Sequence, residues 1–115
     1  MPKDDLLGLV QMLDTERKAA GKVQGIGRED YDSDENLRLA LAHLVQVIGE
    51  AARRVSIETC TAHPEIPWRE IVGMRHKTVH DYMIVDEDVV WEVVSTDLPP
   101  LITALEKIVP PDEAQ

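Results

Sequence analysis

The fold is decided by residues 66–82, which read Ile66-Pro67-Trp68-Arg69-Glu70-Ile71-Val72-Gly73-Met74-Arg75-His76-Lys77-Thr78-Val79-His80-Asp81-Tyr82. Pro67 suits the first position of a helix, where its missing N–H leaves no hydrogen bond unmade. Five side chains then recur at helical spacing, namely Trp68, Ile71, Val72, Arg75 and Val79. The pattern predicts a helix that begins at Pro67 and ends near His80 to Tyr82.

Polar side chains crowd the end of this predicted helix. They are Arg75, His76, Lys77, His80, Asp81 and Tyr82. Together they supply a fixed cation, two imidazoles that titrate near neutrality, an acid and a phenol. This concentration of reactive groups makes the helix end the candidate functional site.

The order Arg75-x-x-x-x-His80-x-Tyr82 resembles the signature of the HEPN superfamily, and most closely its HepT-like branch. The flanking segments match as well: Ile48-Gly49-Glu50-Ala51-Ala52 upstream, residues 64–71 leading in, and residues 85–91 followed by Asp97-Leu98-Pro99 downstream. The resemblance covers nearly the whole chain, so we expect one HepT-like domain over residues 1–115.

The resemblance implies an all-α, HEPN-type up-and-down bundle of four to five helices that forms a homodimer. It also implies a metal-independent endoribonuclease without a cofactor, the toxin of a type VII toxin–antitoxin pair, acting on RNA. The implied antitoxin is a minimal nucleotidyltransferase of the MntA type. Arg75 and His80 would be catalytic, with two motifs meeting in one cleft across the dimer, and His76, Lys77 and Tyr82 would bind substrate or support the site.

Tyr82 carries a second implied role, because in HepT-like proteins the matching Tyr is the residue that the antitoxin blocks with AMP. An AMP group there would bring negative charge and bulk into a cationic site and repel the substrate phosphate. One position departs from the family pattern: Asn usually follows the motif Arg, and His76 stands there. The departure concerns the hydrogen bonding of the active site rather than the fold.

RNA cleavage without a metal requires that the 2′-hydroxyl lose a proton, that the leaving 5′-oxygen gain one, and that charge on the phosphate be stabilised. His80 can transfer either proton, and Arg75 can grip two phosphate oxygens. Five residues on a regular helix are about 140° apart, so these two side chains do not share a face. Either the helix ends before His80, or the long Arg75 side chain closes the gap, or a second subunit completes the site.

Simpler roles compete with catalysis. Arg75 can form a surface salt bridge with Glu70, Asp81 or a distant acid, and His80 can cap the helix C-terminus, where a cation suits the helix dipole. His76 and His80 are four residues apart, which is a metal-ligand spacing, and Asp81 could be a third ligand. No Glu lies between the two histidines as in a zincin, so a metal site is the weaker alternative.

The rest of the chain predicts further helices by its apolar spacing. A first helix is expected from Asp4, which can cap it, to about Ala20, with Gly21 as the stop. Residues 21–32 lack helical periodicity and are predicted to form a loop. A second helix is expected from Ser33 or Asp34 to about Thr59, and it is apolar on more than one face, so it should pack centrally or at a dimer seam.

Several single residues carry expectations of their own. Gly49 should permit a close helix approach, Asp86 should cap a helix, and Pro99 with Pro100 should interrupt or restart the last one. Trp68 and Trp91 are predicted to pack in the core or at the dimer interface rather than to stack on bases. Glu50 could be an interface acid or pair with Arg53 or Arg54.

Composition bounds the class of protein. Apolar residues make up 43% of the 115 and aromatic residues only 3%, with no Phe, so we expect an aliphatic core between helices. The formal net charge of -10 argues against a protein that coats nucleic acid through bulk charge, although a local basic pocket would still permit a nuclease.

The single cysteine, Cys60, allows no internal disulfide and is taken as structural or incidental. The N-terminus does not open a signal peptide, and no apolar run is long enough to span a membrane, so the expected location is cytoplasmic.

Two functions from different classes fit these observations. The first is the ribonuclease toxin, favoured by the complete set of Arg75, His80 and Tyr82. The second is a non-catalytic HEPN module that binds a nucleotidyltransferase, with His80 purely structural, and the His76 departure and the acidic charge favour it.

Overall fold

The computed structural model describes residues 1–74 and 85–111 of the chain. Every regular element in these two ranges is helical, and no sheet forms within them. The elements are α1 (Lys3–Val23), α2 (Arg28–Asp32), α3 (Glu35–Arg53), α4 (Ile57–Ala62), α5 (Trp68–Val72), α7 (Glu87–Glu92), η2 (Val93–Asp97) and α8 (Leu98–Glu106). The prediction of an all-α bundle is confirmed.

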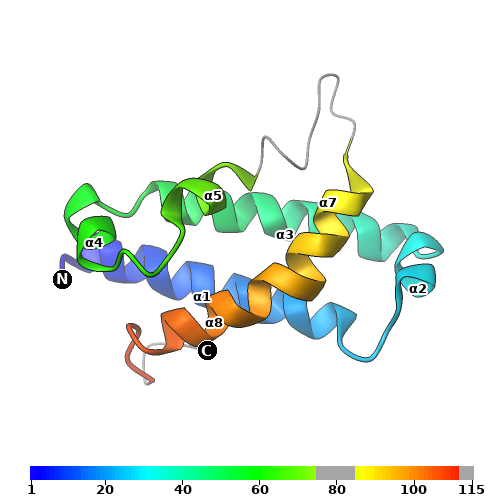
Figure 1. Ribbon diagram of the computed structural model, residues 1–115, viewed down its shortest axis with the longest axis horizontal. Coiled ribbons are helices and arrows are strands. Elements are labelled where there is room, and N and C mark those ends of the chain that lie inside the picture. Colours follow the sequence, from blue (N-terminus) through cyan, green and yellow to red (C-terminus); the bar gives the residue numbers. More distant parts are fainter. Residues whose placement is uncertain (75–84, 112–115) are drawn as a thin grey trace.

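The two long helices, α1 and α3, lie antiparallel and form one layer (Figure 1). They approach closely at Gly8, where a Cβ atom would stand 3.3 Å from Val55 Cγ2 and 3.4 Å from the carbonyl oxygen of Ala51. A larger side chain at Gly8 would therefore push the helices apart. The pair forms the scaffold on which the shorter helices pack.

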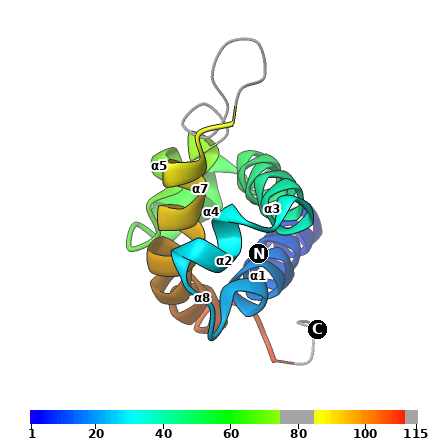
Figure 2. The ribbon, with the colours of Figure 1, turned by 90° about the vertical axis from the view of Figure 1, so that its right-hand side faces the viewer.

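The helices α7, η2 and α8 follow one another without a loop and form a single rod that crosses the α1–α3 pair (Figure 1). Viewed along the long helices, α5 and this rod form the second layer (Figure 2). The core between the layers is aliphatic, as predicted; its fully buried side chains include Leu9, Met12, Leu13, Leu41, Val45, Ile48, Val90, Val94, Leu98 and Leu105. Tyr31 is the one aromatic ring among the described residues that is fully buried.

The first helix is longer than predicted. Gly21 does not stop it, and the N-terminal cap position is Pro2 rather than Asp4. The helix ends instead before Gly25, whose φ of 78° lies in the left-handed region that glycine adopts most readily. The predicted loop over residues 21–32 is also wrong in part, because α2 forms inside it. This helix follows Gly27, whose N–H donates a hydrogen bond to the Asp30 carboxylate at 3.0 Å.

The second long helix begins as predicted, with the Asp34 side chain accepting from Leu37 N–H at 3.0 Å. It ends at Arg53 and not near Thr59, because Ser56 is the N-cap of the next helix, α4, and its side chain accepts from Thr59 N–H. The buried Asp5 carboxylate accepts from Ser56 N–H at 2.9 Å, and from the hydroxyls of Ser56 and Thr59 at 2.5 Å each. Those hydrogen bonds hold the pKa of Asp5 below its usual range and join the start of α1 to the start of α4.

Pro67 takes the N-cap position of α5 rather than its first turn, and the Asp86 side chain caps α7 as expected, accepting from Val89 N–H at 3.2 Å. Pro99 and Pro100 restart the last helix without breaking the rod. Before them the helix widens into the π-helical η2, in which Leu98 N–H donates to the carbonyl of Val93. The prolines then lie in the first turn of α8, where no intrahelical N–H is needed.

Candidate functional site

The predicted site residues, Arg75, His76, Lys77, His80, Asp81 and Tyr82, lie outside the described residues. The prediction of one continuous helix from Pro67 to about His80 is wrong, because α5 (Trp68–Val72) ends after little more than a turn with Gly73 as its C-cap. The side-chain geometry of the site residues and their competing salt-bridge, cap and metal roles stay predictions. What the structure describes is how the chain is held just before and just after this segment. Met74 on one side is buried, and Val85 on the other packs half-buried against the core.

Shortly before this segment lies α5, which packs closely against α3. A Cβ atom at Gly49 would stand 3.2 Å from the carbonyl oxygen of Ile71, so the predicted close helix approach at this glycine is confirmed. Ile71 is fully buried beneath α5. Trp68 packs against the core, and its indole N–H donates to the carbonyl of His63 at 3.0 Å. The short helix α5 is therefore held in place by its close contact with Gly49, by the burial of Ile71 and by the hydrogen bond of Trp68.

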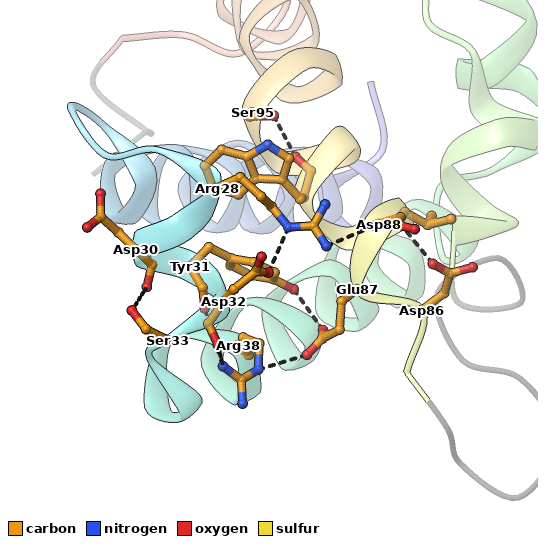
Figure 3. A network of polar contacts seen from close by, with 12 residues as sticks. Arg28, Asp30, Tyr31, Asp32, Ser33, Arg38, Asp86, Glu87, Asp88 and Ser95 are labelled. Atoms are coloured by element: carbon orange, nitrogen blue, oxygen red, sulfur yellow. Dashed lines mark hydrogen bonds and ion pairs between the residues drawn. The ribbon is translucent and has the colours of Figure 1, made fainter.

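On the C-terminal side of this segment, a polar network holds the start of α7 in place (Figure 3). The Glu87 carboxylate accepts from the Tyr31 hydroxyl at 2.7 Å and pairs with Arg38 Nε at 2.9 Å. Beside it, Asp88 pairs with Arg28 at 2.8 Å, and Arg28 also pairs with Asp32 at 2.7 Å. Three helices, α2, α3 and α7, are joined here within a few residues of the predicted site.

Tyr31 lies at the centre of this network. Its ring is 0% exposed and packs on Trp91 with ring centroids 5.3 Å apart and planes at 45°. The Arg28 guanidinium lies 5.7 Å from the ring centroid. Burial, together with the hydrogen bond to Glu87, raises the pKa of Tyr31 well above its ordinary value, so the phenol stays a proton donor. Trp91 packs within the protein, as predicted.

The sequence patterns did not indicate the roles of Tyr31, Arg28 and Arg38. Periodicity assigned the first two to a loop, and no short motif links them to residues nearly sixty positions later. The polar segment Arg28-Glu29-Asp30-Tyr31-Asp32 gives no local indication of these distant partners.

Acidic side chains surround the described flanks of the segment. A hollow of about 290 Å³ between α5, α7 and η2 is lined by Glu70, Met74, Asp88, Val89, Glu92, Val93 and Asp97. None of these lining residues is a cation. The described lining of this hollow therefore supplies no positive charge, and the cationic candidates predicted from the sequence, Arg75, His76, Lys77 and His80, lie outside the described residues.

The other residues singled out in the sequence, Glu50, Arg53, Arg54 and Cys60, lie away from the polar network of α7. Glu50 and Arg54 line one shallow hollow of about 270 Å³ with Gln11, His43, Gln46 and Val47. Arg53, the last residue of α3, and Arg54, its C-cap, are both exposed. Cys60 is partly buried, with its Sγ 3.8 Å from the carbonyl of Val55, which suits a structural residue.

Within residues 1–74 and 85–111, no three His, Cys, Asp or Glu side chains gather closely enough to hold a metal ion. In the same ranges, none of the helices combines the length and the apolar character needed to cross a bilayer.

Comparison with known proteins gives consistent matches. The family model described as "Ribonuclease HepT-like" matches residues 12–108. A Thermococcus cleftensis protein named "Probable ribonuclease HepT" is 39% identical over 80 residues, which are 70% of this chain and 73% of the relative. A Caldanaerobacter subterraneus protein named "Putative RNase TTE0752" is 34% identical over 87 residues, 76% of this chain and 78% of the relative.

A longer alignment comes from Methanocaldococcus jannaschii. Its protein named "Putative RNase MJ1216" is 29% identical over 110 residues, 95% of this chain and 91% of the relative. No solved structure matches the chain significantly.

Proposed function

This chain belongs to the HepT-like ribonuclease family, and we propose that it is a metal-independent endoribonuclease, the toxin of a toxin–antitoxin pair. The observation that carries the proposal is the family match over residues 12–108, which includes an intact Arg75-x-x-x-x-His80-x-Tyr82. The substrate class is RNA, which agrees with the names of the relatives.

The proposed chemistry assigns each step to a named group. The His80 imidazole removes the proton from the 2′-hydroxyl, or returns one to the leaving 5′-oxygen. The Arg75 guanidinium binds two phosphate oxygens and stabilises the charge that grows on them in the transition state. His76 and Lys77 add positive charge for the backbone of the RNA. No step uses a metal ion.

A homodimer would supply the second proton-transfer group. Since Arg75 and His80 are about 140° apart on a regular helix, one motif alone places them on different faces. Two copies meeting in one cleft would bring an Arg75 and a His80 from different subunits to the same phosphate. Within one chain, both flanks of the motif segment are fixed, by the contact of α5 with Gly49 and by the contacts of Glu87 with Tyr31 and Arg38.

The proposed partner is a minimal nucleotidyltransferase that blocks the toxin by transferring AMP to the Tyr82 hydroxyl. In this reaction the phenol oxygen attacks the α-phosphorus of ATP, pyrophosphate leaves, and a phosphodiester remains on Tyr82. The new negative charge would lie beside the catalytic cations and repel the substrate phosphate.

The experiment is to incubate purified protein with total RNA in the presence of EDTA, beside the His80→Ala variant. We expect the wild-type protein to fragment the RNA and the variant not to. Fragmentation that stops with EDTA and returns with a divalent cation would instead indicate a metal site at His76 and His80. No cleavage by the folded wild-type protein, with binding to a nucleotidyltransferase retained, would favour the non-catalytic HEPN module.

A further inference from the structure

The N-cap residue of α7 and the first two residues of the helix are all acids, and each one makes a separate contact. Asp86 caps the helix, Glu87 binds Tyr31 and Arg38, and Asp88 binds Arg28. Figure 3 shows that these partners reach α7 from α2 and from the start of α3. The proposed reaction uses none of these groups, although they stand within a few residues of Tyr82 in the chain.

Glu87 with its two partners is more than a surface ion pair. Tyr31 is fully buried, and the side chains of Arg38 and Glu87 are only 25% and 34% exposed. Both carboxylate oxygens are used, one by the phenol and the other by the guanidinium. Partly buried, charge-assisted hydrogen bonds of this kind hold geometry better than exposed pairs do.

Arg38 also ties α2 into the same unit. Its guanidinium donates to the backbone carbonyl of Asp32, and to that of Tyr31 at 3.4 Å. Because these are carbonyls at the C-terminal end of α2, the contacts complete hydrogen bonds that a helix end leaves open. The group of Tyr31, Arg38 and Glu87, which we call the α7 anchor, thus connects three helices through one carboxylate.

We propose that Glu87 is a positioning residue for the ribonuclease site, and that Tyr31 and Arg38 hold it in place. The inference rests on the proposed function. Glu87 follows His80 by seven residues and Tyr82 by five, so the start of α7 is the first described helix start after the motif. A move of this helix start moves the point to which the motif is covalently tied. A shift of about 1 Å at a catalytic group can lower a rate about a hundredfold. The anchor acts on the reaction through backbone position and touches no substrate.

The test compares two conservative changes with a matched control. Tyr31→Phe removes only the hydroxyl, and Glu87→Gln keeps the shape of the side chain but removes its charge. The control is Glu106→Gln, because Glu106 also pairs with an arginine, Arg17, at 2.7 Å, but at the opposite end of the α7–η2–α8 rod. Cleavage rate and apparent RNA affinity are measured in EDTA, with thermal unfolding of each variant.

We expect kcat to fall about tenfold or more in Tyr31→Phe and Glu87→Gln, with KM little changed, because misplacement of catalytic groups acts on the chemical step. Glu106→Gln should keep the wild-type kcat. The double variant Tyr31→Phe/Glu87→Gln should lose little more than Glu87→Gln alone, since both changes break one unit. An unchanged kcat in both single variants, with the wild-type protein active, would overturn the proposal.

A second measurement separates this inference from the proposed function. Hydrogen exchange of the backbone amides of α7 should speed up in Tyr31→Phe and Glu87→Gln, and not in Glu106→Gln. If the wild-type protein cleaves no RNA, the proposed function fails and the positioning role fails with it, whatever the exchange. If the wild-type protein cleaves RNA but α7 exchange is the same in all variants, only the anchor is refuted.

Discussion

Glu16 lies on the buried face of α1, one turn from Met12, Leu13 and Ala19, and is 0% exposed. Among the described residues, no group donates a hydrogen bond to either of its carboxylate oxygens. Burial raises the pKa of this carboxyl to about 8, so the side chain is neutral at pH 7. A buried acid without a partner costs stability whenever the unfolded chain can ionise it.

The direction of the pH dependence follows from this shift. In the unfolded chain Glu16 has its ordinary pKa of 4.5, and in the folded chain about 8. Below the lower value both states are protonated, and stability is greatest. Between the two values the folded state holds one more proton, so the free energy of unfolding falls by about 1.4 kcal/mol per pH unit as pH rises.

We therefore predict that Glu16→Gln removes this part of the pH dependence. Urea unfolding at pH 5, 6, 7 and 8 should show the difference in stability, variant minus wild type, increasing with pH. The exposed Glu58→Gln serves as the control and should follow the wild-type curve. A difference between Glu16→Gln and wild type that is constant over this range would mean that Glu16 is ionised in the folded protein.

Tyr82 carries the prediction about neutralisation. With a partner nucleotidyltransferase and ATP, the wild-type protein should gain the mass of one or more AMP groups and lose ribonuclease activity. Tyr82→Phe lacks the acceptor oxygen, so it should gain no mass and escape neutralisation while keeping its fold. Intact-mass spectrometry checks this, and an equal mass gain on both proteins would assign the modification to another residue.

Single residues also mark where sequence interpretation succeeds and fails. Asp34 and Asp86 were predictable caps, because the signal for a cap lies within three residues of it. The burial of Glu16 had a local signal too, since it follows Leu9 by seven residues and Leu13 by three. The bond between Tyr31 and Glu87 had none, because it joins residues 56 positions apart.

At the scale of elements, the wrong end of the second long helix and the missed α2 both arise from contacts made by distant residues. Apolar spacing continued the second long helix past Arg53, and only the Asp5 carboxylate, 51 positions from Ser56, explains why the chain turns there. The short α2 is held by Arg28 and Arg38 contacts that periodicity does not contain. The two long helices were thus predictable from local pattern, whereas the short α2 and the end of α3 were set by tertiary contacts.

Replacing each of two glycines near the end of α1 by alanine should change stability in opposite directions. Gly25 has a φ of 78°, so Gly25→Ala should destabilise the protein by about 1 kcal/mol. Gly21 lies inside the helix with no atom within 4 Å of a new Cβ, so Gly21→Ala should stabilise it by about 0.5–1 kcal/mol. Urea unfolding of both variants checks the signs, and a stabilising Gly25→Ala would contradict this account of the turn.

At the scale of the whole molecule, α3 presents apolar surface that the described part of its own bundle leaves uncovered. Leu39 is 63% exposed, and Leu44 and Val47 are only partly buried. Together with the need for two motifs at one phosphate, this favours a homodimer. Sedimentation at micromolar concentration should give about twice the 12.9 kDa mass of one chain. A monomer under these conditions would count against the shared cleft.

The ribonuclease proposal makes a definite prediction about how the bond between phosphorus and the 5′-oxygen of RNA is broken. If the 2′-hydroxyl attacks the phosphate and the 5′-oxygen leaves, every cut must produce a 2′,3′-cyclic phosphate and a 5′-hydroxyl end. The most direct measurement is therefore to identify the ends of RNA fragments made in EDTA by the wild-type protein and by His80→Ala. We predict cyclic phosphate and 5′-hydroxyl ends from the wild type and no fragments from His80→Ala. Fragments with 5′-phosphate ends, or equal cleavage by the two proteins, would contradict the account.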